Sequence, residues 1–427
     1  MSKTHHPLAG MRRNISRLAS GAVVSQILMV ASTPLLTRIF NPEAFGVMAA
    51  FTAAYAIAIP ITTLKYDAAV ILPKATSSAV SLTVLVVFIA TTIVLLVSGL
   101  LGVANWLSLL PDLNVVNLWL PLALWLGVLY TLTQQWSARH NDYKHFARSQ
   151  VIGTVLNIGT SLSLGLLFGG QPHYLVLGFV CGMLGSLGYM ILSRSKKIRV
   201  KFKVNVTRLL QRAKVYRQFP VLVLPSTLLM TIGQSSIPLV LSIYYAIGDV
   251  GQFAIANRLL LVPVALIGGA LGESFRSEFV RRQRERLDAT SLFNKTLKTL
   301  AILALPMFSL LFVAAPWLFS IIFGSDYEEA GYVSRALVLA VAAQFMAIPF
   351  ACVFVALRQT AIGLRVHIVA TVVPLVLLWV AAEIQLSMVN ALGIYSAATA
   401  ICMAMLLIIA QRLCHASDGM NKMKMSL

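Results

Sequence analysis

Charged residues are scarce in this chain. Only 11% of its 427 residues are Asp, Glu, Lys or Arg, whereas 58% are hydrophobic. An ordinary soluble domain carries about 25% charged residues, so this composition leaves too much apolar surface for a soluble fold. The sequence therefore indicates a membrane protein with several spans.

Several common functional patterns are also missing. The four cysteines, Cys181, Cys352, Cys402 and Cys414, form no CxxC pair, which argues against zinc or a disulfide framework and predicts inert packing residues. The sequence has no glycine-rich phosphate loop and no nucleophile elbow, so we expect neither a cofactor nor an enzyme active site. No apolar core followed by a small-residue cleavage site opens the chain, which predicts no cleaved signal peptide.

The hydrophobic residues gather in twelve stretches. These are 18–37, 44–64, 75–104, 113–138, 149–168, 173–193, 218–246, 250–272, 299–323, 336–357, 362–382 and 384–411. Each is close to or above the roughly 20 residues that a helix needs to cross the hydrocarbon of a bilayer. Runs such as 82–101 do not alternate polar and apolar residues, so the sequence predicts transmembrane helices and not a β-barrel.

Basic residues mark one side of the predicted membrane. Residues 194–217 hold ten Lys/Arg and no acidic residue, and with both termini inside, 31 of the 34 Lys/Arg fall at inner positions. Positive residues are retained on the cytoplasmic side, so this distribution predicts cytoplasmic termini. It also explains the net charge of +20 without nucleic-acid binding. The exceptions are Arg38 and Arg335, near predicted outer ends, and Arg258, within a span.

An internal repeat divides the chain. The pattern at 32–36, 39–40 and 45–46 recurs at 236–240, 243–244 and 250–251, an offset of about 204 residues that also brings Pro60 near Pro263. We expect an all-α membrane protein with two six-helix bundles, 1–193 and 218–427, joined by a basic cytoplasmic linker, 194–217. The halves run in the same direction, so the repeat is parallel, an arrangement typical of transporters with a central cavity.

Ionisable residues at membrane depth are the candidate site. Arg258 lies roughly 12 to 14 Å below the outer boundary of its predicted span, where an arginine costs about 2.5 to 3.5 kcal/mol unless it faces water or a partner. We interpret it as an anion-binding residue of a cationic cavity; a buried pair with a carboxylate is the alternative. Further polar or basic candidates for the same cavity are Asn257, Arg38, Lys65 and Gln234. For Arg38, snorkelling to the outer interface is the alternative.

Two carboxylates are candidates for ion coupling. Asp67 and Glu273 lie near the predicted cytoplasmic side of the cavity wall, where a carboxylate could bind and release a proton or pair with Na⁺. Ordinary loop pairing with Lys65 or Arg276 is the alternative for each. The histidines form no ligand set, and no metal site is predicted.

Five sequence blocks resemble the bacterial polysaccharide-transporter family. They are 33–46 (TPLLTRIFNPEAFG), 64–74 (LKYDAAVILPK), 136–144 (WSARHNDYK), 251–263 (GQFAIANRLLLVP) and 323–331 (FGSDYEEAG). Asp67 departs from the family, whose members more often carry Glu there. The resemblance implies an inner-membrane flippase of the multidrug/oligosaccharidyl-lipid/polysaccharide superfamily, which moves undecaprenyl-diphosphate-linked oligosaccharide from the cytoplasmic to the periplasmic leaflet. Arginine suits its diphosphate.

Other functions remain open at this point. A cation-coupled drug antiporter would have the same architecture, but would favour acidic residues over Arg258 in the cavity. A membrane-embedded polysaccharide polymerase or ligase would need a larger outward loop than any in this sequence, and a scaffolding protein would not explain a midplane arginine. The expected partners are lipid-linked oligosaccharide, membrane lipids and a polysaccharide polymerase with its chain-length machinery, and no nucleic acid.

Overall fold

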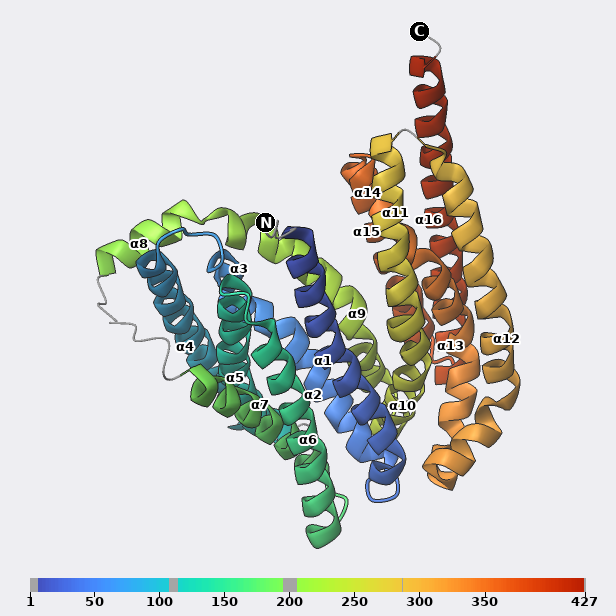
Figure 1. Ribbon diagram of the computed structural model, residues 1–427. Coiled ribbons are helices and arrows are strands. Elements are labelled where there is room, and N and C mark those ends of the chain that lie inside the picture. Colours follow the sequence, from blue (N-terminus) through green and yellow to red (C-terminus); the bar gives the residue numbers. More distant parts are fainter. Residues whose placement is uncertain (1–6, 107–113, 195–205, 286, 426–427) are drawn as a thin grey trace. The chain divides into compact units, whose positions relative to one another are not determined.

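The computed structural model describes residues 7–106, 114–194, 206–285 and 287–425, and these residues form helices and turns without a strand (Figure 1). They group into two compact units, Met1–Leu239 (unit 1) and Val240–Leu427 (unit 2). The predicted division at 194–217 stays a prediction, because 195–205 lie outside the described residues.

Unit 1 contains seven long or medium helices and two short ones. They are α1 (Pro7–Leu36), α2 (Pro42–Thr63), α3 (Tyr66–Ala69), α4 (Thr76–Trp106), α5 (Asn114–Arg139), α6 (Tyr143–Phe168), α7 (Pro172–Arg194), α8 (Val206–Val215) and the π-turn η2 (Phe219–Val223). Helix α9 (Leu224–Tyr244) runs across the boundary of the two units.

The described residues of unit 2 form six long helices and several short helical segments. They are α10 (Ile247–Pro263), η3 (Val264–Gly268), α11 (Gly269–Glu285), α12 (Ala289–Phe323), η4 (Ser325–Tyr327), α13 (Glu328–Ala347), η5 (Ile348–Ala351), α14 (Cys352–Ala356), α15 (Thr360–Glu383) and α16 (Met388–Met425).

Each of the twelve predicted apolar stretches overlaps a helix or a continuous helical run. Among the described residues, ten helical segments are long and apolar enough to cross a membrane. Helix α1 adds a shorter apolar segment, Gly21–Leu36, and α5 coincides with the predicted stretch 113–138. Gln134 and Gln135 lower the hydropathy of α5. The all-helical membrane fold is therefore confirmed. Ten spans are found among the described residues, and the count of twelve stays a prediction.

Helix α2 begins at a recognisable signal. Asn41 caps α2, because its Oδ1 accepts a hydrogen bond from the Ala44 backbone N–H at 3.0 Å. Pro42 follows at the first helical position, where its missing N–H costs nothing. These residues belong to the 33–46 block, so part of that block specifies a helix start.

Small residues bring α6 and α7 into close contact. A Cβ atom added at Gly153 would overlap Ser186, and one added at Gly178 would overlap Ser161. Ser186 Oγ also donates to the Ser149 carbonyl at 2.9 Å. In a membrane, such small-residue contacts and interhelical hydrogen bonds replace the hydrophobic effect as the source of helix association.

Helix α8 is the described part of the predicted basic linker. It crosses the end of α4 (Figure 1), and Leu209 and Ala213 on one face pack against the cluster of buried residues around Leu82. Two basic residues lie in its last turn: Lys214 is exposed, and Arg212 is half-buried beside the apolar face. A short helix with one apolar and one basic face is typical of a segment that lies at a membrane surface.

Gln252 joins two parts of unit 2. Its Nε2 donates to the Asp326 carbonyl at 2.7 Å, and its Oε1 accepts from the Ala330 N–H at 3.1 Å. The side chain is buried, and the neighbouring Tyr327 is fully buried. Two blocks that lie 74 residues apart in the sequence, 251–263 and 323–331, therefore meet through one amide.

Candidate functional site

The backbone of unit 1 turns sharply after α2. Leu64 and Lys65 both have left-handed conformations, with φ of 45° and 57°, and α3 begins immediately afterwards. This turn directs Asp67 into the protein, where it is only 3% exposed. Its Oδ1 has no hydrogen-bond partner among the described residues. A buried carboxylate oxygen without a partner is costly, so this position is a candidate for binding a proton or a cation.

Arg139, at the end of α5, holds the segment that follows α3. Its guanidinium donates to the carbonyls of Val70, Ile71, Pro73 and Lys74 at distances between 2.6 and 3.3 Å. Four carbonyls at the end of an irregular segment thereby gain one common donor. The sequence placed Arg139 in a family-like block without assigning it a role; the structure shows that it connects the 136–144 block to the 64–74 block.

Tyr66 connects the same segment to α8. Its hydroxyl donates to the Ala213 carbonyl at 3.1 Å, and burial raises the pKa of this hydroxyl above its ordinary value. Asp67 therefore lies between two fixed contacts, with Tyr66 attached to α8 and the following residues attached to α5.

A cavity of about 430 Å³, lined largely by apolar surface, lies within unit 1. Its polar lining residues come from α1, α2, α5, α6 and α7 and are uncharged: Ser25, Gln26, Tyr55, Tyr130, Gln150, Thr154, Asn157 and Ser186. Two of its oxygens, Ser25 Oγ and Gln150 Oε1, are buried without a hydrogen-bond partner among the described residues. The sequence showed Gln26 and Asn157 within spans, but no motif brought them together, because the lining comes from five separate helices.

The other candidates of unit 1 are less enclosed. Arg38 follows α1 and is exposed, Gln234 lies on α9 and is exposed, and Lys65 is half-buried at the turn before α3. Arg38 already has an interaction partner within the chain. Within unit 1, the structure therefore brings together only Lys65 and Asp67 from the predicted set.

Arg258 and Asn257 belong to unit 2, on α10. Arg258 is the twelfth residue of this 17-residue helix, and both side chains are half-buried. Arg258 is engaged in an interaction within the chain. At a rise of about 1.5 Å per residue, its Cα lies roughly 16 Å from the start of the helix. Its depth in the membrane stays a prediction.

Glu273 differs from Asp67 in its surroundings. It lies on α11, is exposed, and accepts a hydrogen bond from Arg276 Nη2 at 2.8 Å. Both side chains of this pair are more than half exposed, so the pair contributes little to stability. The arrangement matches the loop-pairing alternative for Glu273.

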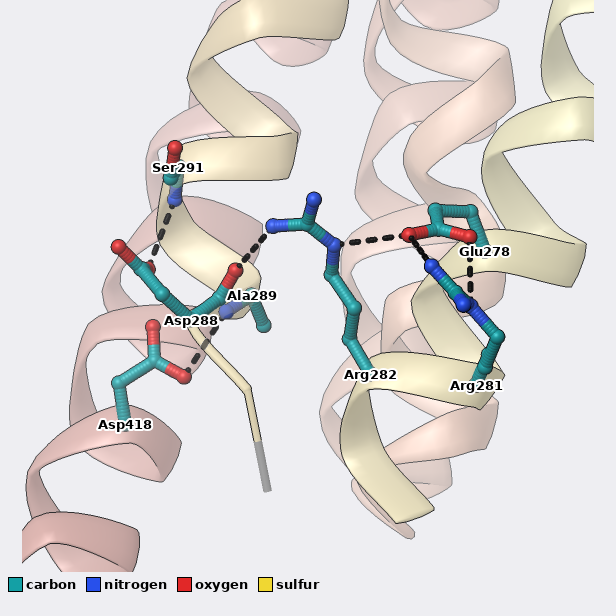
Figure 2. Close-up of polar contacts among 7 residues, drawn as sticks. All are labelled: Glu278, Arg281, Arg282, Asp288, Ala289, Ser291 and Asp418. Atoms are coloured by element: carbon teal, nitrogen blue, oxygen red, sulfur yellow. Dashed lines mark hydrogen bonds and ion pairs between the residues drawn. The ribbon is translucent and has the colours of Figure 1, made fainter. Parts of the chain in front are cut away.

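A polar network joins α11, α12 and α16 in unit 2 (Figure 2). Asp418 accepts hydrogen bonds from the backbone N–H groups of Ala289 and Thr290 at 3.1 and 2.8 Å, which caps the start of α12 from a distant helix. Arg282 bridges Glu278 and the Asp288 carbonyl at 3.0 and 2.8 Å. The donors and acceptors of this network satisfy one another, so we interpret it as a structural joint.

Groups of three or more His, Cys, Asp or Glu side chains placed to hold a metal do not occur among the described residues. The four cysteines are unpaired thiols, each half-buried or buried.

Comparison with known proteins identifies the family. The family model described as "Polysaccharide biosynthesis protein" matches residues 35–331. The succinoglycan biosynthesis transport protein ExoT of Rhizobium meliloti (strain 1021) is 26% identical over 350 residues, which cover 77% of this chain and 66% of ExoT. The chain thus spans slightly less than two thirds of that relative's length.

Solved structures show the same fold at low identity. An inward-facing multidrug resistance MATE family transporter of the MOP superfamily aligns with a TM-score of 0.71 at 12% identity, covering 92% of this chain and 95% of that chain. The lipid II flippase MurJ in an inward closed conformation aligns with a TM-score of 0.68 at 14% identity, covering 92% and 86%. The family model matches more than half of the chain, so the chain belongs to the polysaccharide biosynthesis protein family, and its fold is similar to that of these two solved structures.

Proposed function

We propose that this protein is a flippase that moves undecaprenyl-diphosphate-linked oligosaccharide from the cytoplasmic to the periplasmic leaflet by alternating access. The main support for the proposal is the family match over residues 35–331. One fold can support several functions, and this match favours polysaccharide biosynthesis among them. The likeness to ExoT, named as a transport protein, supports the same direction.

The proposed substrate contacts are basic and polar. Arg258 would bind the diphosphate through bidentate hydrogen bonds, for which its planar guanidinium is suited, and Asn257 would assist from the adjacent position. Arg38, Lys65 and Gln234 would line the path. The structure favours Asp67 over Glu273 as the ion-coupling residue, because Asp67 is buried with an unpartnered oxygen whereas Glu273 is exposed and paired.

The protein would act in the bacterial inner membrane with both termini cytoplasmic, as the distribution of basic residues predicts. It would carry out transport and no covalent chemistry, and would deliver its substrate to a polysaccharide polymerase and chain-length machinery. The drug-antiporter alternative shares the fold, and the family match favours the lipid-linked sugar. A polymerase or ligase is disfavoured because the matched relative is named as a transport protein.

The test uses a strain that lacks the gene and is complemented with variants. Lipid-linked intermediates are measured by mass spectrometry, together with surface polysaccharide and protein abundance. Arg258→Ala should lose export and accumulate lipid-linked oligosaccharide on the cytoplasmic leaflet, and Arg258→Lys should retain part of the activity because it keeps the charge without the planar fork. Arg276→Ala, which removes an exposed arginine of the same unit, is the control and should export normally.

Two outcomes would contradict this assignment. If the strain without the gene accumulates no lipid-linked oligosaccharide, the substrate class is wrong. If Arg258→Ala is present at wild-type abundance and exports normally, Arg258 is a packing or pairing residue.

A further inference from the structure

A groove of about 690 Å³ lies on unit 2 between α12, α13 and α16. Its lining includes Phe312, Tyr332, Arg335, Leu386, Asn390 and Ile394. The groove residues of α13 and α16 belong to the first turns of these helices, and Phe312 lies in the second half of α12. The basic-residue distribution assigns these helix ends to the outer side of the membrane.

A proline in α12 explains why an arginine is fixed in this groove. Pro316 has no N–H, so the Phe312 carbonyl has no helical donor. Arg335 supplies one from α13: its Nε donates to the Phe312 carbonyl at 2.7 Å, and its Nη2 donates to the Val313 carbonyl at 2.8 Å. The sequence had placed Arg335 just outside a predicted span, but α13 begins at Glu328, so Arg335 lies two turns inside the helix.

Gly331 makes this arrangement possible. A Cβ atom added at Gly331 would overlap the backbone of Pro316, so only glycine lets α13 approach the proline this closely. Arg335 is one helical turn further along the same face, where it reaches the freed Phe312 carbonyl and the neighbouring Val313 carbonyl. The position of its guanidinium is therefore determined by backbone contacts on two helices.

The third nitrogen of the guanidinium, Nη1, has no hydrogen-bond partner among the residues that the structure describes. The ring of Tyr332 lies 5.7 Å from the Arg335 Cζ and gives a cation–π contact. The two carbonyls and the Tyr332 ring are neutral, so the positive charge of Arg335 has no balancing anion among these contacts. An arginine within a transmembrane helix requires an anion or water.

Aromatic residues indicate the depth of Arg335 in the membrane. Trp317, Trp379 and Tyr332 are all in unit 2 and are 68%, 49% and 44% exposed. Large exposed Trp and Tyr side chains gather at the level of lipid headgroups. Tyr332 is within one helical turn of Arg335, which favours a position of the guanidinium near the lipid headgroups.

We propose that this groove binds one glycerophospholipid of the outer leaflet, with Arg335 bound to its phosphate and one acyl chain along Phe312, Val389 and Ile394. The chemistry favours a single phosphate, because Arg335 is the only charged residue among those that line the groove. A diphosphate of a transported lipid would call for more than one cation. The site is separate from Arg258 and does not depend on the transported substrate.

The test is photo-crosslinking of the purified full-length protein in nanodiscs. The probe is phosphatidylglycerol with a diazirine in its acyl chain, and crosslinked peptides are mapped by mass spectrometry. In the wild-type protein we expect adducts on the groove-lining peptides of α12, α13 and α16. Unlabelled phosphatidylglycerol should compete, whereas diacylglycerol, which has the chains without the phosphate, should not.

Two variants separate binding from folding. Arg335→Gln should lower the crosslinking yield about tenfold by removing a charge-assisted contact, but it also frees the carbonyls of α12. Gly393→Leu leaves Arg335 intact and fills the groove, since a Cβ atom at Gly393 meets nothing within 4 Å. It should lower the yield by a similar factor without a fall in the melting temperature. Gly159→Leu, a change at an equally unobstructed glycine of unit 1, is the matched control.

Any of three results would overturn the proposal. These are an unchanged yield in Gly393→Leu, competition by diacylglycerol as strong as by phosphatidylglycerol, and preferential competition by undecaprenyl diphosphate. The last result would assign the groove to the transported lipid.

Discussion

The repeat places Pro60 of α2 and Pro263 of α10 at equivalent positions. The chain continues differently after each of these two prolines. In unit 1, α2 ends three residues after Pro60, and Leu64 and Lys65 reverse the backbone. In unit 2, the chain passes Pro263, forms the π-turn η3 and continues as α11 to Glu285. The π-turn absorbs the disturbance that proline introduces, so the helix does not end.

This difference determines the surroundings of two acidic residues. Asp67 and Glu273 lie 206 residues apart, close to the repeat offset, and equivalent positions would suggest equivalent roles. The turn in unit 1 buries Asp67, whereas the continuous helix in unit 2 leaves Glu273 exposed and paired with Arg276. Backbone direction, more than residue type, decides which carboxylate is enclosed.

We expect the largest effect when each of these two carboxylates is replaced by its amide and substrate transport is compared. Asp67→Asn should reduce substrate transport at least about tenfold, because an amide cannot bind and release a proton. Glu273→Gln should change transport less than twofold, because it removes only an exposed pair. Transport in proteoliposomes with an imposed proton or sodium gradient measures both.

Abundance is the control for this comparison. A neutral amide is cheaper to bury than a carboxylate, so Asp67→Asn should be produced at the wild-type level. Full transport by Asp67→Asn with unchanged ion dependence would remove Asp67 from the coupling mechanism.

The second effect concerns stability. Arg139→Gln should lower the free energy of unfolding by about 2 to 4 kcal/mol, because several carbonyls of 70–74 lose a charged donor. Arg276→Gln, the control in unit 2, should cost less than about 0.5 kcal/mol, since its pair is exposed. Thermal unfolding in detergent compares the two, and equal melting temperatures would show that Arg139 does not hold the segment.

The smallest effect comes from opposite glycine substitutions in the two units. Lys65→Gly should stabilise unit 1 by roughly 1 kcal/mol, because glycine adopts a left-handed conformation without steric cost. Gly269→Ala should stabilise unit 2 by a similar amount, because position 269 is helical and unobstructed. Lys65→Ala and Gly269→Pro are the destabilising counterparts to measure beside them. A loss of stability in Lys65→Gly would mean that its side-chain contacts outweigh the backbone strain.

The sequence predicted the helices well because their signals are long and local. Apolar runs of about 20 residues and signals such as Asn41-Pro42 depend on neighbours in the chain, and the structure confirms them. The predicted stretch 250–272 included the continuation past Pro263 but ended too early, since the charges of 276–285 resemble a loop in sequence although α11 extends to Glu285.

The site was predicted less completely because its contacts are not local. Arg139 binds carbonyls more than 60 residues away, and the cavity of unit 1 collects single polar residues from five helices. Nothing in the spacing of these residues brings them together. The left-handed Leu64 and Lys65 also carry no signal, since neither is a residue type that favours this conformation.

The two hydrogen bonds of Gln252 restrict which other residues can occupy position 252. It uses an N–H donor and a carbonyl acceptor of one side chain at once, in a buried place. Glutamate has the same shape but no donor when ionised, and leucine or methionine would leave both backbone groups without a partner. Among the common residues, only Asn has the same pair of groups, and its side chain is one carbon too short. We therefore expect related chains with the same α10–α13 contact to vary freely around position 252 while retaining glutamine at it.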